Sequence, residues 1–296
     1  MATLQELRQR VRAITNTRKL TKAMELVASA RLRRAQERIE AMRPYADRML
    51  ELMAGTARAS GSVRSFPLLQ RRDVRTVAIV PVTGDRGLAG AFNAQILRRA
   101  TALYRELQGQ GVDARWLPVG RKGISTLRFS RFELEGSWGG FSDNPHYGDA
   151  QAIAHRLAEL YTGEDVDRVV LVYNHFVSAL VQHVTVSDVL PISEEIIETS
   201  DEERERDRLA GDFIFEPEPE QILERLLPVY LETEIYRALL ESAASEQGAR
   251  MTAMRYASNA AGELIDSLTL SMNRARQAEF TQEILEVVAG ADALTA

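Results

Sequence analysis

Apolar side chains recur at alternating steps of three and four residues along the first part of the chain. This spacing is typical of the buried seam of a coiled coil. Good helix formers fill most of residues 15–35, where no Gly or Pro occurs. The pattern predicts a helix over residues 2–55, with a kink or short break at Pro44. The seam positions are Leu4, Leu7, Val11, Ile14, Arg18, Thr21, Glu25, Ala28, Leu32, Ala35, Ile39 and Met42.

Two turns of this seam are polar. Arg18, Thr21 and Glu25 occupy three successive positions where a coiled coil ordinarily carries apolar residues. Buried charge without a partner weakens such a structure. We therefore expect this stretch, facing Gln247 and Arg250 or their neighbours, to be completed by partners in a larger assembly.

The last part of the chain shows the same period over fifteen positions. At 1.5 Å per residue, a helix over residues 221–288 would span roughly 100 Å. Because the chain leaves and returns at one end, the two terminal helices can pair only antiparallel. We expect a bend at Pro228, and no cover from this chain over the apolar turns 284–294. The seam positions are Tyr236, Leu240, Ala243, Gln247, Arg250, Met254, Ala257, Ala261, Leu264, Leu268, Ser271, Ala275, Ala278, Gln282 and Leu285.

Between these helices the period changes. Short β-branched and alternating runs predict strands at 75–83, 113–120, 167–174 and 180–191. Helical patterns lie between them at 93–108 and 149–163. Strands alternating with helices predict an α/β domain. The expected fold is a long antiparallel two-helix coiled coil with an inserted, Rossmann-like α/β domain on a mixed sheet.

Five regions follow from these patterns. They are the N-terminal coiled-coil helix at 1–56, a connector at 57–72, the α/β domain at 73–192, an acidic linker at 193–218 and the C-terminal coiled-coil helix at 219–296.

Charge is distributed unevenly along the 296 residues. Residues 8–48 hold twelve Arg or Lys against four acids, whereas residues 194–207 hold eight acids against two Arg. A basic face of this kind is typical of a surface that meets an acidic partner. The chain has no Cys, which excludes disulfides and thiolate chemistry. No stretch approaches the roughly 20 apolar residues that span a bilayer, so we expect an intracellular protein with peripheral membrane contact at most.

Candidate chemistry is sparse. The motif GDRGLAGAFN (84–93) follows a strand and opens a helix, but its glycines match neither G-x-G-x-x-G nor a GK[ST] loop. A tight strand-to-helix turn is the simpler interpretation, and a phosphate site at the helix N-terminus is the alternative. None of the four His has metal-ligand spacing with a carboxylate, and no nucleophile elbow occurs. The sequence therefore predicts no catalytic, metal or cofactor site.

Two other classes of function stay open on the residues alone. A nucleotide-binding α/β enzyme would use the motif at 84–93. A nucleic-acid-binding coiled coil would use the Arg-rich N-terminal helix. Its charges, however, spread round the helix without aromatic residues for base stacking.

Four stretches resemble the gamma subunits of bacterial F-type ATP synthases over nearly the whole chain. They are residues 16–36 with 43–46, residues 84–93, residues 216–219, and residues 245–265 running on to 273–294. The second is similar to the family's S/T-D-R-G-L-C-G-x-x-N, with Ala89 in place of the Cys.

This resemblance implies a non-catalytic central rotor stalk that couples proton-driven rotation of a membrane ring to ATP synthesis or hydrolysis. It implies four partners: the alpha and beta subunits of a hexameric head, the epsilon subunit and the c-subunit ring. It implies no cofactor and no nucleic acid. The expected location is the cytoplasmic face of the bacterial plasma (inner) membrane, with membrane contact only through the c ring.

The resemblance also implies three contact regions. The beta subunit would contact Lys22, Met24, Arg250, Arg276, Gln277 and Thr281. An apolar tip turning in a collar would comprise Ile284, Leu285, Val287, Val288 and Leu294. The side towards the c ring and epsilon would comprise Pro44, Tyr45, Phe213, Phe215 and Glu216.

Overall fold

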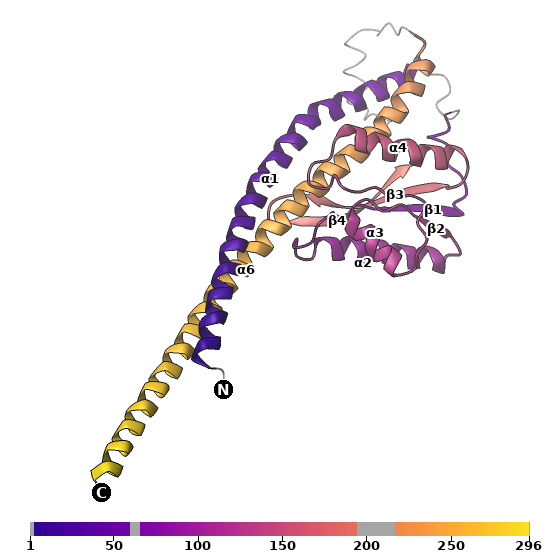
Figure 1. The fold of residues 1–296 in the computed structure, drawn as a ribbon. Helices are drawn as coiled ribbons and strands as arrows, with labels where there is room; N and C mark the ends of the chain where they lie inside the picture. The colour runs from indigo at the N-terminus through magenta and orange to yellow at the C-terminus, as the bar shows by residue number, and fades with distance from the viewer. Residues whose placement is uncertain (1–2, 60–65, 194–216, 296) are drawn as a thin grey trace. The chain divides into compact units, whose positions relative to one another are not determined.

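A computed structural model describes residues 3–59, 66–193 and 217–295 (Figure 1). The elements in chain order are α1 (Leu4–Ala59), β1 (Thr76–Pro81), α2 (Phe92–Gly109), β2 (Asp113–Trp116), α3 (Arg121–Phe129), α4 (Tyr147–Thr162), β3 (Arg168–Phe176), β4 (Gln182–Leu190) and α6 (Pro219–Thr295). The chain forms two compact units. We call Met1–Ala28 with Arg250–Ala296 the helix-pair unit, and Ser29–Ala249 the sheet unit. The domain ranges given above stay predictions.

The sheet unit is built on four strands in the order β2-β1-β3-β4. β1 pairs parallel with β2 and with β3, whereas β4 pairs antiparallel with β3. The predicted mixed sheet is therefore confirmed. Helix α3 was not predicted by the sequence pattern.

Helices cover both faces of the sheet, and each face has its own core. Ala78 and Val80 of β1 pack on one face with α4 and with parts of α1 and α6. Val77 and Ile79 pack on the other face with α2. Successive side chains of a strand point to opposite faces, so a strand covered on both sides reads as a continuous apolar run. This accounts for the run at 75–83.

The first helix begins at a capping box. The Thr3 hydroxyl accepts a hydrogen bond from the backbone N–H of Glu6, and the Glu6 carboxylate accepts one from the backbone N–H of Thr3. Two of the N–H groups left unpaired at a helix start are satisfied in this way.

Both long helices continue through a proline. The break considered at Pro44 is absent, because α1 runs on to Ala59, and α6 likewise continues through Pro228. Proline removes the N–H that would bond the carbonyl four residues earlier. Here these are the carbonyls of Glu40 and Glu224. Both prolines and both glutamates are exposed, so water can replace the missing donors.

Within the helix-pair unit, α1 and α6 run antiparallel. Glu25 bonds Arg255, and Arg18, two turns earlier on α1, lies against Gly262 farther along α6. This confirms the predicted antiparallel pairing of the terminal helices.

The buried seam of α1 in this unit follows the predicted period. Leu7, Thr21, Glu25 and Ala28 are buried, whereas Arg18 is exposed.

The seam of α6 is partly displaced from the predicted one. Met254 and Ala261 are buried as expected. Between and beyond them, Ser258, Ile265 and Met272 are less exposed than their predicted neighbours Ala257, Leu264 and Ser271. The predicted and the observed seam of α6 have the same period, so the spacing of apolar residues does not distinguish them. Packing against α1 decides which of the two sets of positions is buried.

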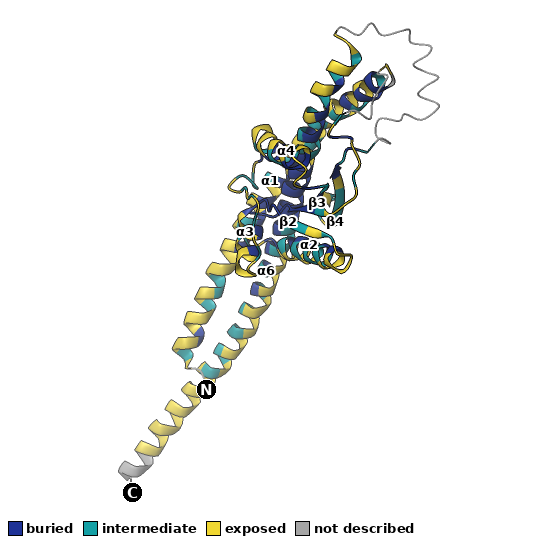
Figure 2. Ribbon diagram, turned by 90° about the vertical axis from the view of Figure 1, so that its right-hand side faces the viewer, coloured by how far each residue is buried: buried dark blue, intermediate teal, exposed yellow. Residues whose placement is uncertain are grey.

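The last described part of α6 has no cover from this chain. Every residue from Arg276 to Gly290 is exposed (Figure 2). The prediction that no helix of this chain covers the apolar turns 284–294 is confirmed for residues 284–290, whose side chains the structure describes.

Candidate functional site

A buried carboxylate lies at the centre of the polar stretch of the helix-pair unit. Glu25 Oε2 accepts a hydrogen bond from Lys22 Nζ at 2.9 Å, and Oε1 accepts one from Arg255 Nε at 3.0 Å. Lys22 lies one turn earlier on α1, and Arg255 reaches across from α6. The charge of Glu25 is therefore compensated inside the chain, and completion of the polar stretch by outside partners stays a prediction.

These hydrogen bonds set the protonation of Glu25. The bond from Lys22 and then that from Arg255 lower the pKa of the Glu25 carboxyl, and they outweigh burial, which acts in the opposite direction. Glu25 is consequently ionised at neutral pH.

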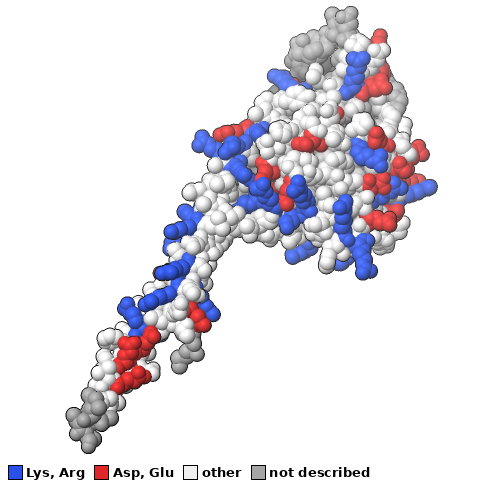
Figure 3. Space-filling view, viewed as in Figure 1, with Lys and Arg blue, Asp and Glu red and all other residues white. Residues whose placement is uncertain are grey.

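The first helix carries an excess of cations in this unit. Residues 3–28 hold six Arg or Lys against two Glu. Figure 3 shows Lys and Arg side chains spread along the visible face of the molecule, including α1. The side chain of Lys22 is 58% exposed although it bonds Glu25. A solvent-facing cation held at a fixed position by a buried carboxylate is suited to contact an acidic partner.

The predicted beta-contact residues differ in accessibility. Lys22, Arg276, Gln277 and Thr281 are exposed, and Met24 is half-buried. Arg250 is buried, with 7% of its surface exposed. Five of the six predicted residues are therefore at least partly accessible to solvent, whereas Arg250 is buried.

The predicted tip is apolar and exposed. Ile284 is 49% exposed, Leu285 62%, Val287 72% and Val288 50%. The side chain of Leu294 lies outside the described residues. Four large apolar side chains on uncovered helical turns mark an interaction surface.

The predicted ring-facing residues are only partly described. Pro44 and Tyr45 are exposed in the sheet unit, with Tyr45 at 51%. Phe213, Phe215 and Glu216 lie outside the described residues.

The motif at 84–93 adjoins the place where an α/β fold of this topology binds nucleotides. The chain passes from β1 through α2 to β2 on one side, and it reaches β3 on the other, so the switch point lies between β1 and β3. Ligands of such folds bind there, outside the carboxyl ends of the strands.

In this chain α6 fills that crevice. Ser242 Oγ donates to the carbonyl of Val82 at 3.3 Å, and Ser245 Oγ donates to the carbonyl of Asn174 at 3.2 Å. A Cβ atom on Gly84 would lie 2.7 Å from the carboxyl carbon of Glu246. The space left beside Val82 and Ser242 is about 10 Å³, far below the roughly 300 Å³ of a small-molecule pocket. A nucleotide cannot enter while α6 is in place.

Asp85 of the same motif organises loops instead of a ligand. Its carboxylate accepts hydrogen bonds from the backbone N–H groups of Arg121, Gly140 and Ser142, each at 2.9 Å. Burial raises the pKa of Asp85, but these backbone donors together outweigh it and leave the pKa lowered. The motif is therefore a structural turn, as the simpler interpretation held.

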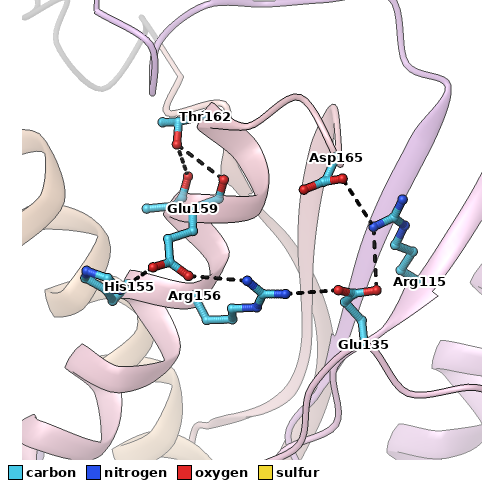
Figure 4. A network of polar contacts seen from close by, with 8 residues as sticks. Arg115, Glu135, His155, Arg156, Glu159, Thr162 and Asp165 are labelled. Carbon is cyan, nitrogen blue, oxygen red and sulfur yellow. Dashed lines mark hydrogen bonds and ion pairs between the residues drawn. The ribbon is translucent and has the colours of Figure 1, made fainter.

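One group of carboxylates in the sheet unit is engaged in surface ion pairs. Glu135 bonds Arg156 at 3.0 Å and lies 3.5 Å from Arg115 (Figure 4). Arg156 also bonds Glu159, which His155 approaches at 3.2 Å. This chain of alternating charges is a solvated network and shows no acid paired with a nucleophile.

The described part of the chain offers neither a metal site nor a membrane span. Residues 3–59, 66–193 and 217–295 contain no group of three or more His, Asp or Glu able to hold a metal ion. None of the described helices has a stretch apolar enough, and poor enough in charge, to cross a membrane.

Sequence reasoning did not single out Arg255, and the signal for it was weak. Arg255 stands directly after the seam position Met254, but its pairing with Glu25 depends on the register between the two helices, which the period alone leaves undetermined.

Comparisons with known proteins agree over the full length. Residues 3–294 match the family ATP-synt, described as ATP synthase. The chain is 46% identical over 297 residues to the ATP synthase gamma chain of Rubrobacter xylanophilus, and 43% identical over 317 residues to that of Nostoc punctiforme, with all of each chain covered.

Solved structures are similar as well. A chain from the central stalk and c ring of the Tetrahymena thermophila mitochondrial ATP synthase matches with a TM-score of 0.59 and 30% identity, over 81% of this chain and 99% of that one. A chain of the Euglena gracilis mitochondrial enzyme has a TM-score of 0.67 at 17% identity, over 98% and 94% of the two chains, and shows the shared fold.

Proposed function

This chain belongs to the gamma-subunit family of ATP synthases, and we propose that it acts as the non-catalytic central-stalk rotor of a bacterial enzyme. Its partners are the alpha and beta subunits, the epsilon subunit and the c ring. It binds the membrane only through that ring, on the cytoplasmic face. The observation that carries this proposal is the run Arg276–Gly290, in which a well-formed helix is exposed on every side.

The mechanism is a population shift driven by rotation. Each beta subunit samples several conformations, and a neighbour stabilises the one that it contacts best. An asymmetric stalk presents a different surface to each of three beta subunits at every angle. Turning the stalk therefore changes nucleotide affinity site by site, and nucleotide binding acts back on the stalk with equal coupling.

The exposed polar residues form the proposed beta contact. Lys22, held by Glu25, would meet an acidic segment of beta, and Arg276, Gln277 and Thr281 would meet a polar loop. Thr281 donates its hydroxyl proton to the carbonyl of Gln277 at 2.9 Å, so its hydroxyl oxygen is left to accept a hydrogen bond from beta. Met24 supplies apolar contact beside Lys22.

The uncovered tip is proposed to turn inside an apolar collar of the head. Burying large apolar side chains contributes roughly 1.5–3 kcal/mol each. Apolar contact is non-directional, which suits a surface that must slip past its neighbour during rotation. Pro44 and Tyr45 are proposed to lie towards the c ring and epsilon.

The first test measures the subunit composition of the complex that the chain forms. Expression with alpha and beta subunits should yield a complex of one gamma to three of each, because the exposed apolar tip needs a partner to cover it. Recovery of the chain without them, together with tight nucleotide binding by the isolated chain, would argue for an enzyme instead.

The second test reverses charge at both proposed contacts. Lys22→Glu with Arg276→Glu should leave assembly intact and lower ATP synthesis by roughly tenfold or more, since each loses a charged contact to beta. Arg98→Glu with Arg128→Glu is the matched control, because both side chains are exposed on α2 and α3 of the sheet unit. Normal synthesis by the first variant, or an equal loss in the control, would contradict the assignment.

A further inference from the structure

Asp85 joins three separate segments of the sheet unit around one carboxylate. Besides the N–H groups that it accepts from, its own backbone N–H donates to Ser142 Oγ at 2.8 Å. The loop that follows Trp138 is therefore fixed against the turn after β1. None of the proposed contact surfaces gives this arrangement a role.

The loop fixed by Asp85 presents a second carboxylate to both long helices. Asp143 Oδ2 accepts a bond from Arg31 Nη1 of α1 at 2.7 Å, and Oδ1 accepts one from Gln247 Nε2 of α6 at 2.9 Å. Arg86 of the Asp85 turn lies 3.8 Å from the same carboxylate. Gln247 is 1% exposed, and the Asp143 side chain 26% exposed.

Three further polar bonds hold α6 to the sheet within two turns of Gln247. Two are the Ser242 and Ser245 bonds to backbone carbonyls described above. The third joins His175 Nδ1 at the end of β3 to Glu241 Oε2 at 2.6 Å. A hydrogen bond weakens steeply when its angle departs from linear, whereas apolar contact has no preferred direction. These bonds therefore add directional resistance to rotation of α6 about its own axis, beside the resistance of the close-packed core.

We infer that Asp143 is a positioning residue for torque: it locks the inserted α/β domain to α1 and α6, so that this part of the chain turns as one body. Asp85 serves the lock indirectly by fixing the loop that carries Asp143. The inference rests on the proposed rotor function, in which force entering near the α/β domain must reach the helices. Asp143 touches no catalytic subunit in this scheme.

The first experiment measures how firmly the loop is held. In the full chain assembled with alpha and beta subunits, Asp143→Ala should accelerate amide hydrogen exchange at residues 140–144 by about tenfold, since it removes two bonds to a charged group. Asp143→Glu keeps the carboxylate and should restore most of the protection. Glu135→Gln is the control, because its ion pairs join only surface groups of the α/β domain. Unchanged exchange in Asp143→Ala would overturn the lock.

The second experiment measures stiffness, which a residue needed only for folding would not change selectively. A bead attached to the α/β domain of a single immobilised complex reports angular fluctuation while the motor pauses. Asp143→Ala should widen the angular distribution and lower proton-coupled ATP synthesis, at an unchanged rate of ATP hydrolysis by the complex without its membrane part. Asp143→Glu and Glu135→Gln should behave as wild type.

The outcomes separate the two proposals. Failure of the wild-type chain to assemble with alpha and beta subunits would refute the rotor function itself. Normal rotation of wild type with an equal angular distribution in Asp143→Ala would refute only the torque lock.

Discussion

Glu25 is paired within the chain, yet the two cations that pair with it stay accessible to a partner. A carboxylate in a coiled-coil seam is costly when unpaired, and here Lys22 and Arg255 pair with it. Both cations remain about half exposed, at 58% and 52% of their side chains. The ion pair therefore stabilises the helix pair and leaves positive charge facing solvent.

Removing this carboxylate should destabilise the helix-pair unit. Glu25→Gln is expected to lower the free energy of unfolding by about 1–2 kcal/mol, because it weakens two bonds to half-exposed cations. Chemical denaturation of the full chain gives the value, and hydrogen exchange over residues 20–28 localises it. Glu37→Gln, which breaks only an exposed pair with Arg33, should change stability by less than about 0.5 kcal/mol.

The lowered pKa of Asp85 predicts that the stability contributed by this carboxylate depends on pH. Its pKa is lowered on folding from an ordinary value of 3.8. The stability that it contributes is therefore fully present above pH 3.8 and is lost as the pH falls through the lower folded-state pKa. Amide resonances of Gly140 and Ser142 in a pH titration should report this loss. Asp85→Asn should abolish the titration, and an unchanged profile in that variant would assign it to another group.

Sequence alone could identify Glu25 as anomalous but not name its partner. The period places a charge in the seam, whereas the choice of Arg255 depends on helix register. In the same way, the motif at 84–93 is recognisable, yet the role of Asp85 depends on Arg121, Gly140 and Ser142, which are distant in the chain.

At the scale of elements, long periodic segments were predictable and short ones were not. The terminal helices and the four strands follow from apolar spacing. Helix α3 has nine residues and contains Gly123, so its propensity is poor. It forms because tertiary contact overrides that propensity.

The start of α3 depends on a glycine. Gly120 has φ of +91°, and a Cβ there would lie 2.0 Å from the carbonyl oxygen of Thr83. Gly120→Ala should therefore lower the free energy of unfolding by about 3 kcal/mol or more, measured by chemical denaturation. Gly109→Ala at the end of α2 meets no atom within 4 Å, and it should stay within about 1 kcal/mol of wild type. Equal effects would show that the turn accommodates a side chain.

At the scale of the whole molecule, the chain leaves the apolar tip of α6 uncovered by any other part of itself that the structure describes. The exposed tip predicts self-association of the isolated chain, because apolar patches seek cover. Ile284→Gln with Val288→Gln should reduce the associated fraction in sedimentation velocity and leave thermal unfolding unchanged, since neither side chain packs inside the chain. A matched pair of buried substitutions, Ile153→Gln with Leu157→Gln in α4, should instead unfold the sheet unit.

Whole-molecule function was the level least accessible from the residues. The spacing of apolar residues predicts that the two terminal helices pair and that the C-terminal helix extends beyond the N-terminal one. It does not predict what surrounds the tip. That information came from resemblance and from full-length relatives. A surface selected to fit other subunits carries no internal contact from which its partner could be deduced.

The filled crevice beside β1 and β3 has a pharmacological consequence. A compound designed for the crevice at the carboxyl ends of β1 and β3 would have to displace α6 before it could bind. It would therefore compete with a helix rather than with a nucleotide. Its effect would be to uncouple the α/β domain from the long helices, so that proton-driven ATP synthesis falls while the catalytic sites still hydrolyse ATP.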